Sequence, residues 1–357
     1  MPHSLLPPPH RILLIKPSSL GDVTHTLPVL HLLRRRYPDA KISWLVAPYC
    51  SGLLEGHPDL DEVILFDRRR FGTAWKNPSA GLDLIRFKRD LRRRQFDWVI
   101  DLQGLFRSGW LAWQTRAPIR IGFANAREFS WLFYTHRIPI ATMEQHAVDR
   151  YLRIALAAGC ADEPIEFPFA VSQSDRTTVA QMTGDEPYAV LLPGANWPTK
   201  RWPVENYQAL VDPIRQRFGL RCIVAGGRDT IDLAKAIPSA LNLAGKTNLP
   251  QLVALLERSN LVIANDSGPM HIAAALGKPL VTLFGPTNPI RTGPYNRPES
   301  VVRVDIPCSP CYSRHCSHTS CLRWLTIEPV LATAAEQLSN EKSVGSASAD
   351  ADRFNAV

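Results

Sequence analysis

The chain has 357 residues, of which 45% are hydrophobic and 21% charged, a composition typical of a folded globular protein. This length exceeds one ordinary domain core, so we expect two domains. No apolar run approaches the roughly 20 residues of a spanning helix, and residues 1–10 lack the basic region and apolar core of a signal peptide. We therefore expect a cytoplasmic protein.

The net charge of +8 is concentrated in the N-terminal half. Residues 1–160 hold 23 Lys or Arg against 14 Asp or Glu, whereas the remainder holds 18 against 19. Three arginine clusters contribute, at residues 34–36, 68–70 and 92–94. Any single cluster is explained by a solvated helix end. The asymmetry between the halves favours an anionic partner: nucleic acid, a phosphorylated substrate or an acidic membrane face.

Strand and helix patterns alternate through the N-terminal half, which predicts a parallel sheet with helices on both sides. The predicted strands are residues 11–16, 42–46, 63–66 and 98–101, and the predicted helices are residues 24–36 and 82–94. The loop after the first strand, residues 17–23, contains one glycine and an acid. It is therefore not the Gly-rich loop of dinucleotide-binding proteins.

Asp22 lies just past the carboxyl end of the first strand, the edge where open α/β sheets bind ligands. Its carboxylate can cap the following helix, or it can act as a general base facing a cleft. Gln103 follows a later strand and can face the same cleft. His25, one helical turn beyond Asp22, can orient substrate, although a lone histidine is usually structural.

A polar stretch containing prolines separates the halves, and a second α/β run follows it. We expect an N-terminal domain over residues 1–165, a linker over 166–186, a C-terminal domain over 187–338 and a disordered tail over 339–357. The second run predicts strands at residues 188–192, 220–225, 241–245, 261–264 and 280–284, with helices from residue 204 and over 249–258, 270–276 and 326–338.

Residues 265–277 (NDSGPMHIAAALG) join a buried strand to a helix whose N-terminus is free. Such an end offers unpaired backbone N–H groups and the positive pole of the helix dipole, which favour phosphate. The alternative is an α/β crossover without a ligand.

Three motifs in order along the chain resemble a known family, the lipopolysaccharide heptosyltransferases of glycosyltransferase family 9. The motifs are residues 16–28 (KPSSLGDVTHTLP), Pro193-Gly194 with residues 200–203 (KRWP), and residues 265–268 (NDSG) with His271 and residues 283–287 (LFGPT). The resemblance spans roughly residues 11–330. It implies an α/β protein of the GT-B fold, with two Rossmann-like domains facing across a cleft, the first binding the acceptor and the second the nucleotide sugar.

The resemblance implies an inverting, metal-independent transfer of heptose from ADP-L-glycero-β-D-manno-heptose to the lipopolysaccharide inner core, without a cofactor. It makes Asp22 the general base and Lys200 a positive charge on the diphosphate. The remaining donor-binding candidates are Asn196, Asp266, Ser267, Gly268 and His271, and the acceptor-side candidates are Ser19, Gly21, His25 and Gln103. Ala195-Asn196 stands where the family has a threonine pair, which leaves the donor contacts, and with them the donor, open.

The implied acceptor is a phosphorylated glycolipid at the inner membrane face, so peripheral membrane contact through Arg-rich faces is a further hypothesis. Besides a non-catalytic sugar-nucleotide sensor of the same fold, two alternatives remain. The first is a family 9 transferase with another nucleotide sugar or acceptor. The second is a basic nucleic-acid-binding protein, although no recognition motif supports it and we expect no nucleic acid partner.

Four cysteines cluster within fourteen residues, at Cys308, Cys311, Cys316 and Cys321. A structural zinc competes here with reduced free thiols. Because the spacing lacks the paired C-x-x-C of a zinc ribbon, we predict no metal site. Similar Cys-rich loops occur in the heptosyltransferase II branch, which the chain resembles more on this ground.

Overall fold

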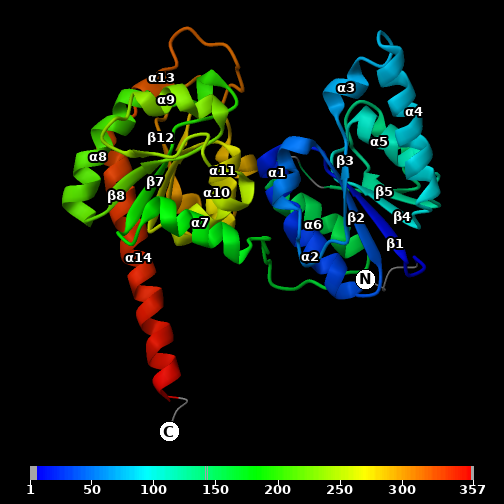
Figure 1. Ribbon diagram of the computed structural model, residues 1–357, viewed down its shortest axis with the longest axis horizontal. Coiled ribbons are helices and arrows are strands. Elements are labelled where there is room, and N and C mark those ends of the chain that lie inside the picture. The colour runs from blue at the N-terminus through cyan, green and yellow to red at the C-terminus, as the bar shows by residue number, and fades with distance from the viewer. Residues whose placement is uncertain (1–5, 141, 143, 355–357) are drawn as a thin grey trace. The chain divides into compact units, whose positions relative to one another are not determined.

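The computed structural model describes the backbone of residues 6–140, 142 and 144–354, and the side chains of these residues as far as Asn340. The chain divides into two compact units, Met1–Ala170 and Val171–Val357, each built on a parallel sheet flanked by helices (Figure 1). Among the residues described, no helix has the length and apolar character needed to cross a membrane.

The sheet of the first unit has the strand order β3-β2-β1-β4-β5-β6, and all its strands are parallel. Its strands are β1 (Arg11–Ile15), β2 (Lys41–Val46), β3 (Glu62–Leu65), β4 (Trp98–Asp101), β5 (Ile119–Phe123) and β6 (His136–Ile138). The central strands β1, β2 and β4 are almost entirely buried and apolar, as expected where helices cover both faces. The chain order reverses between β1 and β4, where such sheets bind ligands.

The described residues of this unit form the α-helices α1 (Leu20–Thr24), α2 (Leu27–Arg36), α3 (Arg68–Gly72), α4 (Pro78–Arg93), α5 (Phe106–Gln114) and α6 (Ala147–Ala157). Helix α2 buries its leucines and packs on α6, and the Tyr37 hydroxyl after α2 donates to the Ala158 carbonyl at 2.6 Å. The last helix of the unit therefore lies beside the first ones.

The second unit repeats this topology, with the strand order β12-β11-β10-β7-β8-β9. Its strands are β7 (Tyr188–Leu192), β8 (Arg221–Val224), β9 (Leu241–Asn242), β10 (Leu261–Asn265), β11 (Leu280–Phe284) and β12 (Val301–Arg303). Its helices are α7 (Gln173–Thr183), α8 (Val204–Phe218), α9 (Ile231–Lys235), α10 (Leu249–Arg258), α11 (Gly268–Ala275), α12 (Pro289–Thr292), α13 (Ser320–Arg323) and α14 (Ile327–Phe354). The reversal of chain order falls between β7 and β10.

The prediction of parallel α/β sheets is confirmed, and several strands end where the sequence placed them. Two details differ. Residues 20–23, predicted as part of a loop, belong to helix α1, so Asp22 stands in a first helical turn. The predicted linker contains α7, which packs on α10 and is held by the ion pair Arg176–Glu257, with Nε–Oε2 2.8 Å.

Part of the tail that was predicted to be disordered is helical, because α14 continues to Phe354. Its composition is rich in alanine, the strongest helix former, which is compatible with this continuation. Residues 355–357 of the predicted tail lie outside the described part of the chain.

Gly122 on β5 makes room for the Tyr134 ring, since a Cβ built there would lie 2.3 Å from that ring. Gly122→Ala should therefore destabilise the protein by roughly 1–3 kcal/mol, the usual cost of overpacking. Gly72→Ala is the matched control, because its Cβ would meet nothing within 4 Å. Thermal unfolding midpoints check this, and an unchanged midpoint for Gly122→Ala would contradict it.

Candidate functional site

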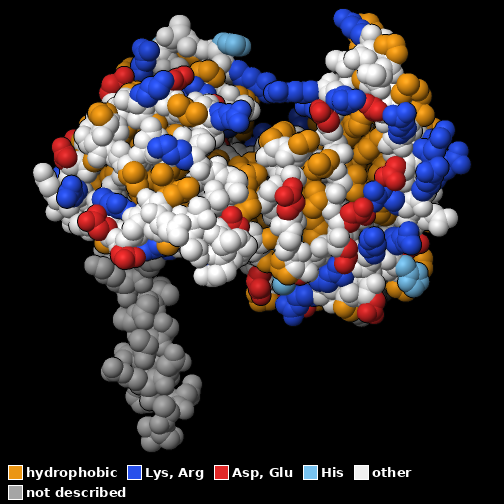
Figure 2. Space-filling model, in the orientation of Figure 1, with side chains coloured by type: hydrophobic (Ala, Val, Ile, Leu, Met, Phe, Trp, Pro, Cys, Tyr) orange, Lys and Arg blue, Asp and Glu red, His pale blue; other side chains and the backbone are white. Residues whose placement is uncertain are grey.

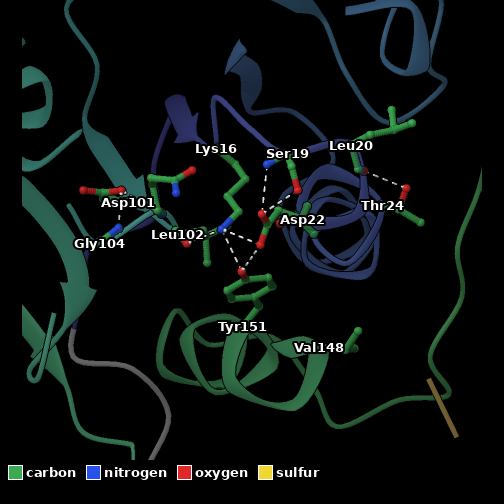
Figure 3. A network of polar contacts seen from close by, with 12 residues as sticks. Lys16, Ser19, Leu20, Asp22, Thr24, Asp101, Leu102, Gly104, Val148 and Tyr151 are labelled. Carbon is green, nitrogen blue, oxygen red and sulfur yellow. Dashed lines mark hydrogen bonds and ion pairs between the residues drawn. The ribbon is translucent and has the colours of Figure 1, made fainter. Parts of the chain in front are cut away.

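The turn between β1 and α1 places a lysine and an aspartate in direct contact. Lys16 Nζ lies 3.4 Å from Asp22 Oδ1, and it donates to the Tyr151 hydroxyl at 2.7 Å and to the Leu102 carbonyl at 3.0 Å (Figure 3). The Tyr151 hydroxyl in turn donates to Asp22 Oδ1 at 3.1 Å. Lys16 is 2% exposed, whereas 37% of the Asp22 side chain remains accessible. One carboxylate is thus fixed by buried groups while part of it stays open to a ligand.

The second oxygen of Asp22 closes the start of α1. Oδ2 accepts from the Ser19 backbone N–H and from the Ser19 hydroxyl, both at 2.9 Å (Figure 3). This is the helix cap that the sequence left as an alternative role for Asp22. The cap engages Oδ2 and the Lys16–Tyr151 pair engages Oδ1, so both carboxylate oxygens have partners, and 37% of the side chain is still accessible.

Charge and burial act in opposite directions on this pair. Burial raises the pKa of Asp22, but the Lys16 ammonium and the hydrogen bonds from Ser19 and Tyr151 outweigh it, so the pKa lies below its usual value. Burial lowers the pKa of Lys16, and Asp22 and Tyr151 more than compensate, so that pKa is raised. Both groups are therefore charged at neutral pH.

The other acceptor-side candidates lie nearby with different degrees of access. Gly21 is a buried residue of α1, and His25 is 4% exposed, with its ring edge-on to His146 at 5.0 Å between centroids. The Gln103 amide oxygen is buried and has no hydrogen-bond partner among the described residues. Ser19 is thus exposed, Gln103 keeps a buried amide oxygen without a partner, and His25 is a packed core residue.

Asp101, at the end of β4, is fully buried and shapes the loop that carries Gln103. It accepts from the Gln103 and Gly104 backbone N–H groups at 2.9 and 3.2 Å and from the Tyr134 hydroxyl at 2.6 Å. Burial raises the pKa of Asp101 in spite of these donors. The residue organises the loop and does not face a ligand.

In the second unit, the turn between β10 and α11 holds a second lysine–aspartate pair. Asp266 is 5% exposed, and its Oδ2 lies 2.6 Å from Lys200 Nζ and accepts from the Thr287 hydroxyl at 2.5 Å. The neighbouring Asn265 accepts from the Trp202 N–H at 3.1 Å and donates to the Pro193 carbonyl at 2.8 Å. These contacts join the turn to the loop after β7.

Helix α11 begins beside this pair with an unused donor. Ser267 is its N-cap residue, but the Ser267 hydroxyl makes no cap bond, and its buried oxygen has no partner among the described residues. Gly268 is the first helical residue, and His271 is buried one turn further along. A hydroxyl, the helix-start N–H groups and Lys200 therefore stand together where an anion is favoured.

The loop after β7 presents Lys200 through the 3-10 helix η3 (Pro198–Lys200). Lys200 Nζ lies 4.6 Å from the centre of the Trp197 ring, and the Arg314 guanidinium lies 4.7 Å from the same ring. Asn196 is exposed at the start of this loop. Trp197 therefore orients two cations on one side of the unit.

The cysteine-containing loop lies against the same region. The Ser313 carbonyl of this loop accepts from the Thr199 hydroxyl at 2.8 Å. The loop also lines a cavity of about 680 Å³, together with Pro198 and Thr199. Cys308, Cys311 and Cys316 are exposed and Cys321 is buried, all as free thiols. In the described part of the chain, no group of three His, Cys, Asp or Glu is placed to hold a metal ion.

The structure adds three residues that the sequence analysis missed as site components. Lys16 and Thr287 lie within quoted motifs, so their positions could have marked them. Tyr151 stands 129 positions from Asp22 and belongs to no motif, so no local signal points to it.

A chain that repeats the Rossmann strand order in two successive units has the organisation of a GT-B glycosyltransferase. The model of glycosyltransferase family 9 (heptosyltransferase) matches residues 84–321. Lipopolysaccharide heptosyltransferase 1 of Pseudomonas aeruginosa is 33% identical, over 86% of this chain and 88% of its own length. The protein belongs to glycosyltransferase family 9, the heptosyltransferase family.

Two further relatives extend the comparison. Lipooligosaccharide heptosyltransferase 2 of Haemophilus ducreyi is 29% identical over 82% of this chain and 88% of its own. The solved structure of E. coli heptosyltransferase WaaC with ADP-2-deoxy-2-fluoro heptose has a TM-score of 0.72 and 26% identity, covering 93% of this chain and 99% of that one. Relatives of both numbered types match at similar identity, so the comparison does not single out the heptosyltransferase II branch.

Lys16→Met removes the charge that lowers the pKa of Asp22, so Asp22 should titrate at higher pH in this variant. In the wild type, the lowered pKa stabilises the fold above the unfolded value of about 3.8, and this stabilisation disappears as pH falls through the folded value. The variant should therefore lose less stability over that acid range.

Carbon NMR of the Asp22 carboxyl and the pH dependence of the unfolding free energy measure both effects. Lys41→Met, at an exposed lysine of β2, is the control and should leave the Asp22 titration unchanged. Identical Asp22 titration in wild type and Lys16→Met would contradict the assignment.

Proposed function

We propose that this heptosyltransferase transfers heptose from ADP-L-glycero-β-D-manno-heptose to the lipopolysaccharide inner core, with inversion and with Asp22 as the general base. The observation that carries the proposal is the Asp22 carboxylate, which Lys16, Tyr151 and Ser19 hold ionised while 37% of its side chain stays accessible. The names of the relatives and the sugar nucleotide bound to WaaC support this donor and this acceptor.

In the proposed reaction, the acceptor hydroxyl gives its proton to Asp22 as its oxygen bonds to the anomeric carbon. The bond between that carbon and the diphosphate oxygen breaks on the opposite face, which releases ADP and inverts the configuration. A carboxylate with a lowered pKa is a weak base toward a resting hydroxyl. Proton transfer therefore accompanies bond formation, when the hydroxyl becomes acidic, rather than preceding it.

The donor side supplies positive charge for the leaving diphosphate. Lys200 is held in place by Asp266, which is itself fixed by Thr287, and the N–H groups at the start of α11 add the dipole of that helix. Ser267 donates its unused hydroxyl to a phosphate oxygen, and Gly268, His271 and Asn196 line the same donor site. In the proposed reaction, this positive charge stabilises the leaving diphosphate, and the reaction uses no metal ion or cofactor. Asp266 acts on Lys200 rather than on the donor.

Membership of the family favours transfer over nucleic-acid binding. Within the family, another nucleotide sugar or acceptor is the competing proposal, because Ala195-Asn196 replaces the threonine pair expected in the donor loop. A screen of nucleotide sugars with mass spectrometry of the products tests it. ADP-heptose, and not DNA or RNA, should also raise the thermal unfolding midpoint, as a ligand of the folded state does.

Asp22→Asn should lower the transfer rate by about 10²–10⁴-fold, the usual contribution of a general base, and leave donor binding nearly unchanged. Rates with ADP-heptose and a core acceptor, and donor affinity by calorimetry, give the two readouts. Asp90→Asn, at an exposed aspartate of the same unit, should keep full activity. Retained turnover in a folded Asp22→Asn protein would remove Asp22 from the mechanism.

Ser267→Ala should leave the stability of the ligand-free protein unchanged or slightly raised, because the hydroxyl has no partner among the described residues. It should weaken ADP binding by roughly three- to tenfold, since a hydrogen bond to a charged oxygen is lost. Ser239→Ala, at an exposed serine of the same unit, serves as the control. Unaltered ADP affinity in Ser267→Ala would place the diphosphate elsewhere.

A further inference from the structure

Three large apolar side chains stand in solvent on one segment of the first unit, residues 68–93, which comprise α3, α4 and the loop between them. Trp75 in the loop is 78% exposed, and Leu82 and Ile85 on α4 are 55% and 49% exposed. We call this the α3–α4 segment. Leu82 and Ile85 are three positions apart on α4, so they share one face of the helix.

The opposite face of α4 is anchored in the core. Phe87 packs against Phe66 and Phe71 with ring centres 5.7 and 5.2 Å apart, and Leu91 is fully buried. Helix α4 is therefore firmly packed through one apolar face, and Leu82 and Ile85 form a second apolar face that is exposed to solvent. Such a face on a soluble unit marks an interaction surface.

Positive charge surrounds the exposed apolar groups. The α3–α4 segment holds nine Lys or Arg against two Asp, a net charge of +7. Both acids are already paired, Asp83 with Arg70 and Arg86, and Asp90 with Arg94. The ion pairs of the described residues leave Arg89 and Arg93 without an acidic partner, on the same face as Ile85 because the spacing is four residues.

The space-filling view agrees with this composition. Figure 2 shows Lys and Arg side chains interspersed with hydrophobic ones over the α3–α4 end of the first unit. Lys76 Nζ lies 4.3 Å from the centre of the Trp75 ring, so a cation accompanies the most exposed aromatic side chain.

We propose that the α3–α4 segment is the surface through which the protein binds an anionic lipid bilayer. Trp75, Leu82 and Ile85 enter the boundary between headgroups and acyl chains, and the arginines meet the lipid phosphates. A nucleic acid would use the charge but would offer Leu82 and Ile85 no apolar environment. A bilayer uses both features. The inference rests on the proposed function only in that a lipid-linked acceptor explains why the enzyme needs this surface.

Vesicle co-sedimentation tests the proposal with the full chain and without nucleotide sugar or acceptor. The wild type should bind vesicles of phosphatidylcholine mixed with phosphatidylglycerol at low salt, and bind pure phosphatidylcholine vesicles far less. The triple variant Trp75→Ser, Leu82→Ser, Ile85→Ser should lose at least about tenfold in partitioning. Trp324→Ser, at a 66% exposed tryptophan of the second unit, is the matched control and should bind like the wild type.

The contribution of the charge is tested separately with the double variant Arg89→Gln, Arg93→Gln. The control is a second double variant, Arg215→Gln, Arg217→Gln, at two exposed arginines of α8. The first pair should reduce partitioning roughly thirtyfold, equivalent to about 1 kcal/mol per charge near an anionic surface. The second pair should have little effect. All the substituted side chains are exposed, so thermal unfolding should stay unchanged.

Equal losses in the control variants, or no binding of the wild type to anionic vesicles, would overturn the proposal. So would duplex DNA binding that is lost in the α3–α4 variants while vesicle binding is retained. Transfer to a soluble, delipidated acceptor should be unaffected by the triple variant. Failure of vesicle binding with intact transfer would therefore refute the lipid surface alone, whereas lost transfer with intact vesicle binding would refute the proposed function.

Discussion

Parallel pairing of β1 with β4, and of β7 with β10, is the constraint on which both halves of this molecule depend. At each pairing the chain order of the sheet reverses, so the loops on its two sides diverge, and polar side chains gather at that edge. The Lys16–Asp22 turn and the Gln103 loop follow β1 and β4. The Lys200 loop and the Asp266 turn follow β7 and β10. Because the topology is repeated, the candidate site residues of each unit lie at the equivalent position of its sheet.

The two lysine–aspartate pairs differ in which partner faces outward. In the first unit Lys16 is buried and Asp22 is partly open, which makes a carboxylate available to a hydroxyl. In the second, Asp266 is the more buried partner and Lys200 the more accessible one, at 17% for its side chain, which makes a cation available to a phosphate. The two pairs therefore bury opposite members, so the more accessible partner is a carboxylate in the first unit and an ammonium group in the second.

Each unit carries one further element outside the repeated sheet. In the first unit it is the α3–α4 segment, and in the second it is the cysteine loop, which contains Cys308, Cys311 and Cys316. The cysteine loop follows β12 and packs beside the Lys200 loop, where Arg314 stacks on Trp197 together with Lys200. The α3–α4 segment follows β3 at the edge of the first sheet and concentrates the positive charge of the N-terminal half. Both elements lie outside the repeated sheet core, where insertions change function without disturbing the fold.

The sequence by itself determined the periodic features: the buried strands, the helix over residues 249–258, and the position of Asp22 just past the first strand. These follow from local patterns, because apolar runs, caps and turn residues act over a few positions. Tertiary structure alone decided which groups meet. Tyr151 reaches Asp22 from α6, Thr287 and Lys200 converge on Asp266, and Trp197 gathers two cations from distant loops. Tertiary structure also decided that His25 is a core residue and that Ser267 keeps an unused hydroxyl, because burial and hydrogen-bond partners depend on chain segments far apart in sequence.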